Sequence, residues 1–126
     1  MWTDEQTRAR VLEGLNPSQG EAVLSKARTL LILAGAGSGK TRTLTCRIAH
    51  GVATGVVRPD QVLAVTFSNR AAAELKERIR GLLEEDLYAP MLGITFHSAG
   101  LAILREAIRA RHPAVPLKDN FSIYLF

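Results

Sequence analysis

The stretch LILAGAGSGKT, residues 31–41, constrains the fold of this chain more than any other. It continues an apolar run, residues 29–34, that has the length of a β-strand buried on both faces of a parallel sheet. Glycines follow, and in such a loop they let consecutive backbone N–H groups converge on an anion. A helix beginning at Lys40 would add the partial positive charge of its N-terminus. The stretch therefore predicts an α/β fold with a phosphate-binding loop between a strand and a helix.

The loop fits the pattern of nucleotide phosphate loops, in which a small residue is followed, after four positions, by Gly-Lys and then Ser or Thr. We expect Lys40 to reach the β and γ phosphates of ATP and the Thr41 hydroxyl to ligate Mg²⁺, which makes these two the predicted catalytic residues. The loop residues expected to hold the nucleotide are Ala34, Gly35, Ala36, Gly37, Ser38, Gly39, Lys40 and Thr41. Two other interpretations remain. A glycine-rich turn can serve close packing alone, and a dinucleotide fold also uses glycines, although in the spacing G-x-G-x-x-G and without the lysine.

Helical and strand-like segments alternate along the chain, as expected for a parallel sheet with helices on its faces. Thr3 is placed to cap a first helix. Asn16, Pro17 and Gln19 form the start signal of a second helix, in which Gln19 would complete a capping box. Asn69 is the expected cap of the helix that follows the second strand. The predicted helices are residues 4–12, 16–25, 40–54, 69–83 and 97–112, the predicted strands are 29–34, 62–67 and 92–96, and residues 113–126 are a loop-like tail.

Composition is that of one soluble globular domain, with 126 residues of which 47% are apolar and 22% charged. No apolar run is long enough to cross a bilayer and the first residues contain no signal-peptide core, so we expect a cytoplasmic protein with no membrane partner. The single cysteine, Cys46, excludes an internal disulfide and a cysteine zinc cluster, and predicts a small buried side chain. The net charge of +4 is compatible with nucleic acid, but charges of both signs are mixed along the chain.

Four sequence blocks occur in order and at close spacing: LNPSQGEAV, AGAGSGKTRTL, AVTFSNRAAAELKERI and GITFHS. Together they resemble the UvrD/Rep family of superfamily 1 DNA helicases, which are ATP-driven motors that translocate on single-stranded DNA. The resemblance covers about residues 15–104. It implies a P-loop NTPase fold of the RecA-like kind, with ATP and Mg²⁺ as cofactors and single-stranded DNA or DNA junctions as partners.

The resemblance assigns two further residues to the nucleotide. Gln19 takes the role of reading the adenine edge, which an amide can do with a paired donor and acceptor. Arg42, directly after the loop, is implied to lie near the nucleotide. From the residues alone, the alternative interpretation of Gln19 is a capping-box side chain, and that of Arg42 is an exposed helix arginine.

The resemblance also implies a DNA-contacting surface at the ends of two strands. Phe67 offers a ring on which a base can stack. The geometry of parallel sheets favours a surface shared with the phosphate loop, because loops at the carboxyl ends of parallel strands gather on one edge. From the sequence alone, the opposite interpretation of Phe67, as a core residue at a strand end, is favoured. The residues implied to contact DNA are Thr66, Phe67, Asn69, Arg70, Thr95, Phe96 and His97.

ATP hydrolysis in this family needs groups that the sequence does not show. No apolar strand here ends in the Asp-Glu pair that holds Mg²⁺ and activates water. We therefore expect residues 1–126 to be the first part of a RecA-like domain, with open strand edges that favour self-association and no unwinding activity alone. The alternatives are a nucleotide- or DNA-binding remnant without catalysis and, less favoured, a small P-loop kinase.

Overall fold

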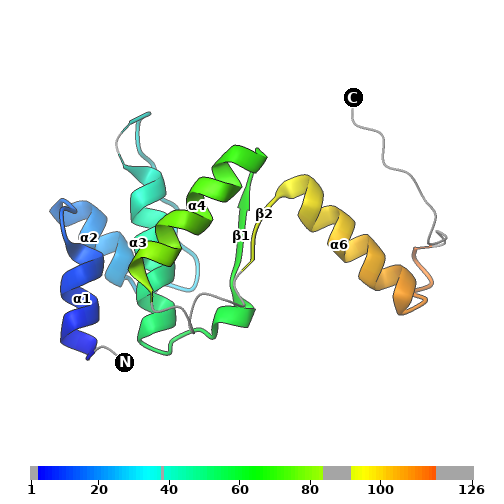
Figure 1. Cartoon of the computed structure of the whole chain (residues 1–126), viewed down its shortest axis with the longest axis horizontal. Helices are drawn as coiled ribbons and strands as arrows, with labels where there is room; N and C mark the ends of the chain where they lie inside the picture. The colour runs from blue at the N-terminus through cyan, green and yellow to red at the C-terminus, as the bar shows by residue number, and fades with distance from the viewer. Residues whose placement is uncertain (1–2, 38, 84–91, 116–126) are drawn as a thin grey trace.

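A computed structural model describes residues 3–37, 39–83 and 92–115 of the chain. The predicted nucleotide-binding residue Ser38 and residues 116–126 of the predicted tail lie outside this part. The elements, shown in Figure 1, are helices α1 (Asp4–Leu12), α2 (Pro17–Leu24), α3 (Lys40–Ala53), α4 (Asn69–Leu82) and α6 (Phe96–Arg109), the short 3₁₀ helix η1 (Pro59–Gln61), and strands β1 (Leu63–Thr66) and β2 (Leu92–Thr95).

The first two helices begin where their capping residues predict. The Thr3 hydroxyl accepts a hydrogen bond from the Gln6 backbone N–H, and the Gln6 side chain accepts one from the Thr3 N–H in return. Asn16 and Gln19 form the same reciprocal box at the start of α2, with bonds of 2.9 and 3.0 Å. Each box satisfies backbone donors that a helix N-terminus otherwise leaves without partners. Both predicted helix starts are confirmed.

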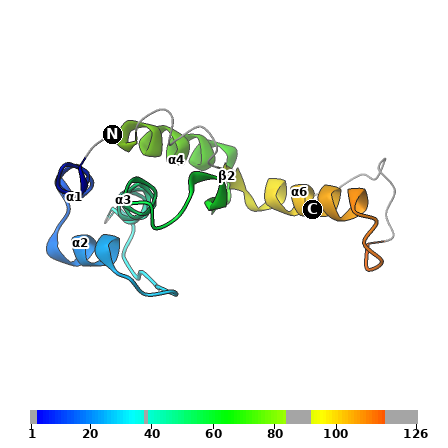
Figure 2. The ribbon, with the colours of Figure 1, turned by 90° about the horizontal axis from the view of Figure 1, so that it is seen from below.

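Helix α3 lies at the centre of the hydrophobic core. It contacts α2, α4 and α1, and Figure 2 shows it between the first two helices and α4. Cys46, Ala49 and Val52 form its buried face, and Cys46 is buried as predicted. The buried core residues are Val11, Val23, Cys46, Ala49, Val52, Ala64, Leu75, Ile79 and Leu83.

Strands β1 and β2 pair in parallel, in a register that places Thr66 opposite Thr95. Two of the three predicted strands are thus confirmed, and the parallel arrangement with them. The third, residues 29–34, is wrong in the described structure, because this segment forms no strand ladder and exposes 79% of Leu31 and 84% of Leu33. A strand requires a neighbour to accept and donate its backbone hydrogen bonds, and within the described residues β1 and β2 pair with each other.

The cap of α4 also differs from the prediction. Ser68, not Asn69, has the extended backbone of a capping residue, and its hydroxyl accepts a hydrogen bond of 3.1 Å from the Ala71 N–H. Asn69 is instead the first helical residue. Either residue type can cap, and β1 ends early enough for the serine to do so. Ala72, Leu75 and Ile79 form the buried face of this helix.

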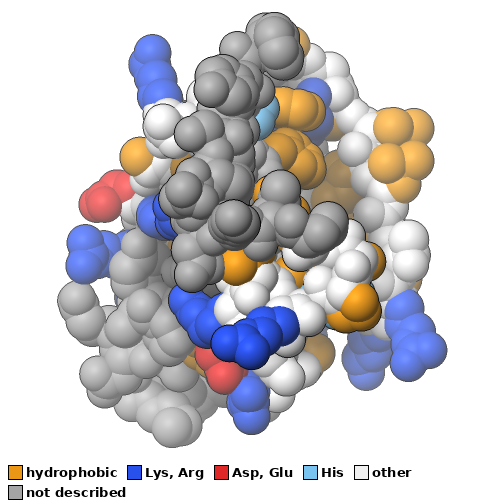
Figure 3. Space-filling view, turned by 90° about the vertical axis from the view of Figure 1, so that its right-hand side faces the viewer, with side chains coloured by type: hydrophobic (Ala, Val, Ile, Leu, Met, Phe, Trp, Pro, Cys, Tyr) orange, Lys and Arg blue, Asp and Glu red, His pale blue; other side chains and the backbone are white. Residues whose placement is uncertain are grey.

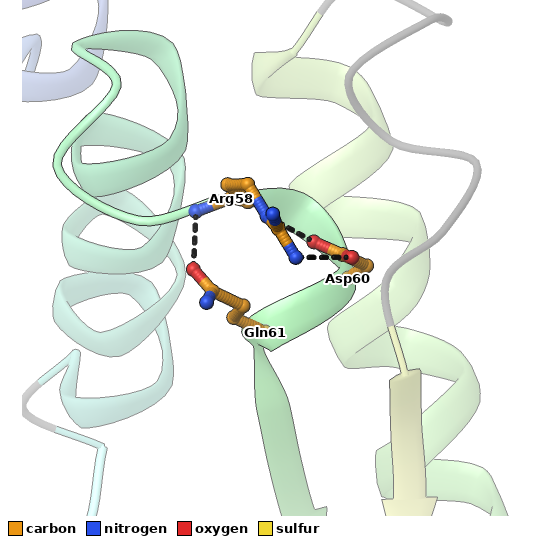
Figure 4. Close-up of polar contacts among 3 residues, drawn as sticks. All are labelled: Arg58, Asp60 and Gln61. Carbon is orange, nitrogen blue, oxygen red and sulfur yellow. Dashed lines mark hydrogen bonds and ion pairs between the residues drawn. The ribbon is translucent and has the colours of Figure 1, made fainter.

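The connection into β1 is a compact polar turn, drawn in Figure 4. The Arg58 guanidinium donates two hydrogen bonds to the Asp60 carboxylate, at 3.0 and 2.9 Å. The Gln61 side chain accepts a hydrogen bond from the Arg58 backbone N–H. Both charged side chains are largely exposed, so this ion pair adds little to the stability of the protein. Its contacts lie within the turn that directly precedes β1.

Helix α6 projects away from the core, as Figure 2 shows, and none of its residues is buried. Among the described residues, its main contacts are with the two strands. Figure 3 views the molecule from the side toward which α6 projects and shows hydrophobic side chains at the surface among Lys and Arg side chains. Within the described ranges, none of the helices has the length and apolar character needed to span a membrane.

Candidate functional site

The glycine-rich loop meets the N-terminus of α3 in a conformation that requires glycine. Gly37 and Gly39 have φ values of +74° and +88°, in the left-handed region that side chains disfavour. Gly39 is the N-cap residue of α3 and provides no side-chain cap to the first N–H groups of the helix. Thr43 is buried, and its backbone N–H and hydroxyl both donate to the Gly39 carbonyl at 3.0 Å. The loop is therefore tied to the first turn of α3.

A hollow of about 290 Å³ lies at the start of α3. Lys40 and Thr41, both exposed, line it together with Gly37 and Gly39. The lining thus combines loop backbone, an ammonium group and a hydroxyl, a set of groups that suits a polyphosphate and its counter-ion. The other predicted loop residues, Ala34, Gly35 and Ala36, are exposed in the segment that leads into the hollow.

Arg78 of α4 lines the same hollow and is a residue that the sequence did not single out. Its guanidinium pairs with Glu74, one turn earlier on the same helix, at 2.6 Å. In the sequence Arg78 stands among mixed charges of the kind that solvate an exposed helix face. No local signal identifies it, because its position depends on how α4 packs against α3.

Gln19 lies against the phosphate loop. A Cβ atom built on Gly39 would stand 2.9 Å from Gln19 Nε2, so the amide closely approaches the loop. Gln19 and Lys40 also line one hollow of about 170 Å³ between α2, residues 32–34 and α3. The capping box and the place beside the loop are compatible, because Oε1 serves the box while Nε2 faces Gly39.

Arg42 is exposed and its guanidinium lies at the turn between α1 and α2. It donates a hydrogen bond of 2.6 Å to the Glu13 carbonyl and packs against Gly14. It also lines the hollow of about 290 Å³ at the start of α3. Burial raises the pKa of the nearby Cys46 thiol, although the positive charge of Arg42 opposes this shift, so the thiol is neutral at neutral pH.

Phe67 and Phe96 meet at the carboxyl ends of the two strands. Their ring centroids are 5.0 Å apart and their planes are tilted by 43°. Phe67 is 87% exposed and Phe96 53% exposed, so the interpretation of Phe67 as a core residue is wrong. The cause is the parallel register, which brings the residues after Thr66 and Thr95 to the same edge. Two large exposed rings in contact with each other are a candidate contact surface.

The other residues implied to contact DNA lie close to Phe67 or Phe96 in the chain, and they differ in how far their side chains are exposed. Asn69, Arg70 and His97 are exposed at the starts of α4 and α6. Thr66 is half-buried and donates to the Ser68 carbonyl. Thr95 is buried, and its hydroxyl caps α6 by accepting from the Ser98 N–H. The starts of α3, α4 and α6 lie toward the same end of the molecule, the upper edge in Figure 1.

In the part of the chain that is described, no three or more His, Cys, Asp or Glu side chains are grouped so that they could hold a metal ion. Mg²⁺ in nucleotide sites typically uses one or two protein oxygens and takes its other ligands from phosphates and water. The exposed Thr41 hydroxyl at the hollow fits that requirement.

Residues 15–125 match the family described as UvrD/REP helicase N-terminal domain. The chain belongs to this family. Individual relatives are also similar to the chain in sequence. It is 46% identical over 115 residues to the ATP-dependent DNA helicase UvrD1 of Mycobacterium leprae and 48% identical over 110 residues to the ATP-dependent DNA helicase PcrA of Leuconostoc citreum. These alignments cover 91% and 87% of the chain but 14% of each relative.

Membership of the UvrD/REP helicase N-terminal domain family confirms the resemblance and implies a RecA-like P-loop fold. The family match extends past the predicted range of 15–104 and includes all of α2 to α6. Helix α1 precedes the match, yet it contributes Val11 to the core and packs on α3. The described structure supplies the loop, its helix and one parallel strand pair of such a fold.

Proposed function

We propose that this chain is part of an ATP-dependent DNA helicase, in which it supplies ATP binding and part of the DNA-contacting surface. The proposal rests on one arrangement above all. Gln19 lies beside the phosphate loop at the start of α3, and two exposed aromatic rings meet where α4 and α6 start. The starts of these three helices lie toward the same end of the molecule in Figure 1. The relatives named above are ATP-dependent DNA helicases, which supports the same conclusion. The chain spans about one seventh of their length, so turnover and unwinding belong to the whole protein.

ATP would bind with its phosphates at the start of α3. Backbone N–H groups of the loop and of the first helical turn donate to the phosphate oxygens, and Lys40 neutralises the β and γ phosphates. Mg²⁺, held by Thr41, supplies charge stabilisation to the phosphates when bound. Arg42 and Arg78, which line the hollow, add positive charge there. Gln19 reads the adenine edge through its amide.

Single-stranded DNA, free or at a junction, would lie across the ends of β1 and β2. The outer faces of Phe67 and Phe96 stack against bases, and Arg70 with Asn69 and His97 contacts the backbone. Thr66 and Thr95 position this surface through their bonds at the strand ends, and the half-buried Thr66 is the one of the two that the DNA backbone can reach. The predicted DNA contact of Thr95 is not proposed, because its buried hydroxyl is used to cap α6. The exposed aromatic pair favours a helicase over a small P-loop kinase, because two adjacent rings in solvent suit the stacking of successive bases of a single strand.

Nucleotide binding can be tested by titrating a fluorescent ATP analogue into the 126-residue chain and its Lys40→Ala variant. Loss of a charge-assisted contact is worth about 1.5–3 kcal/mol, so we expect affinity to fall about ten- to 150-fold. Lys26→Ala is the matched control, because Lys26 is also an exposed lysine but lies on the loop after α2. Equal binding by the wild type and Lys40→Ala would refute the assignment of the loop.

DNA binding can be tested by fluorescence anisotropy with a labelled single-stranded oligonucleotide at fixed salt. Stacking contributes about 1–3 kcal/mol per base, so Phe67→Ala and Phe96→Ala should each weaken binding about five- to 150-fold. Ile103→Ala, an exposed apolar residue of α6 away from the strand ends, should leave it unchanged. The proposed surface is wrong if all three variants bind like the wild type.

A further inference from the structure

Arg47 of α3 grips the end of α2. Its Nη1 atom donates to the Ala22 carbonyl at 2.7 Å and to the Ser25 carbonyl at 2.8 Å. Its Nη2 atom donates a third hydrogen bond, of 3.4 Å, to the Ala27 carbonyl. The last carbonyls of a helix have no partners within the helix and carry partial negative charge. A guanidinium is therefore well suited to this position, because it is planar, permanently charged and offers several donors in a fixed fork.

The opposite end of α2 carries Gln19. The helix has eight residues, so Gln19 and Ala22 lie one turn apart on a short rigid body. Ala22 lines the same hollow as Gln19 and Lys40. Arg47 thus contacts a residue that lines this hollow, through its hydrogen bond to the Ala22 carbonyl, without lining the hollow itself.

Helix α3 connects both ends of this arrangement. It begins with Lys40 of the phosphate loop and carries Arg47 two turns later. The distance between the Gln19 amide and the loop is consequently set by how α2 sits on α3. Val23 of α2 is buried in the same core cluster as Cys46 and Ala49 of α3 and provides a non-directional contact, whereas the Arg47 guanidinium fixes a definite orientation.

We propose that Arg47 is a positioning residue for adenine recognition: it locks α2 onto α3 so that the Gln19 amide is held at the edge of the phosphate loop. This inference rests on the proposed function, in which Gln19 reads the adenine. Arg47 does not touch the nucleotide. A hydrogen bond weakens steeply with small displacements and poor angles, so release of α2 affects base recognition before it affects phosphate binding.

The experiment compares the dissociation constants of ATP, GTP and inorganic tripolyphosphate for the 126-residue chain. Arg47→Lys keeps the charge but cannot reach three carbonyls at once, and Arg47→Ala removes both charge and contacts. We expect each to reduce the preference for ATP over GTP at least fivefold while tripolyphosphate binding changes less than twofold. Arg58→Lys, which alters an equally forked but exposed pair in the turn before β1, should leave all three constants unchanged.

Gln19→Ala and the Gln19→Ala/Arg47→Lys double variant separate the outcomes. If Arg47 acts through Gln19, the double variant discriminates no worse than Gln19→Ala alone. Equal loss of ATP and tripolyphosphate binding in Arg47→Lys would show a general structural role and overturn the inference. If Gln19→Ala lowers the ATP preference and Arg47→Lys does not, the positioning role alone fails. If Gln19→Ala leaves the preference unchanged, the proposed adenine role of Gln19 fails and the inference with it.

Discussion

Gly39 satisfies two separate requirements at one residue. Its φ of +88° lies where a side chain strains the backbone, and a Cβ there would meet Gln19 Nε2 at 2.9 Å. Gly55, after α3, has a similar φ of +73°, but a Cβ at that position would meet no atom within 4 Å. The two glycines therefore differ only in the second requirement.

This difference predicts the effects of two alanine substitutions. Left-handed backbone costs a non-glycine residue about 1–2 kcal/mol, so Gly39→Ala and Gly55→Ala should lower the free energy of unfolding by similar amounts in urea denaturation. Gly39→Ala should in addition weaken binding of the fluorescent ATP analogue, because it displaces the Gln19 amide. Wild-type nucleotide affinity in Gly39→Ala would argue against close packing of Gln19 on the loop.

Gln19 also shows how two interpretations of one residue can both hold. The sequence is compatible with a capping box or a nucleotide contact. The structure confirms the box and places Nε2 of the same amide at the loop. The contact with adenine stays a prediction. The capping box would help it, because an amide already oriented loses less conformational freedom on binding.

At the scale of elements, α3 and α6 have the same length and opposite surroundings. Helix α3 buries Thr43, Thr45, Cys46, Ala49 and Val52, whereas α6 buries none of its residues. Isolated helices of about 14 residues are marginal in water, so most of the stability of each helix must come from packing.

Hydrogen exchange should separate these two helices. We expect amide protection in α3 to approach the free energy of global unfolding, and amides of α6 to exchange far faster through local opening. Hydrogen–deuterium exchange followed by mass spectrometry measures both in one sample, with α4, which buries Ala72, Leu75 and Ile79, as an internal reference. Slow exchange in α6 comparable to that in α3 would mean that another surface covers α6 in solution.

At the scale of the whole molecule, an extended apolar segment and a small sheet are left exposed together. Leu31 and Leu33 are each about four-fifths exposed in the segment that leads to the phosphate loop. The described sheet consists of β1 and β2, whose outer edges have no strand beside them within the described residues. Exposed apolar side chains and open strand edges both favour association between molecules.

We therefore expect the 126-residue chain to self-associate in a concentration-dependent way. Replacing Leu31 and Leu33 together with lysine should shift the chain toward monomer in sedimentation velocity, since charge and lost apolar area both oppose association. Val56→Lys is the control, because Val56 is 78% exposed but lies in the turn after α3. A wild-type chain that is monomeric at all concentrations contradicts this prediction.

Local signals in the sequence predicted the helices well. Thr3, Asn16 and Pro17 mark two helix starts through contacts with residues at most three positions away, so these starts can be recognised without knowing how the rest of the chain packs. The phosphate loop was predictable for the same reason, because its glycines and the helix after it are consecutive. Ser68 and Asn69 were confused because two adjacent residues can both cap.

Contacts between residues far apart in the sequence could not be predicted from local sequence signals. The apolar run at residues 29–34 has strand composition, but a strand exists only where another strand supplies its hydrogen bonds. Arg78 reaches the phosphate hollow because α4 packs on α3, and Arg47 reaches three carbonyls because α2 does. No spacing in the sequence shows either.

The sequence by itself determined where α1 and α2 start and the chemistry of the loop, because each depends on residues that are neighbours along the chain. It also determined the family, through four blocks that occur in order. Only the tertiary structure decided that Phe67 and Phe96 meet in solvent and that Gln19 closes on Gly39. Those positions follow from strand register and helix packing, which are set by the summed burial of many residues far apart in sequence.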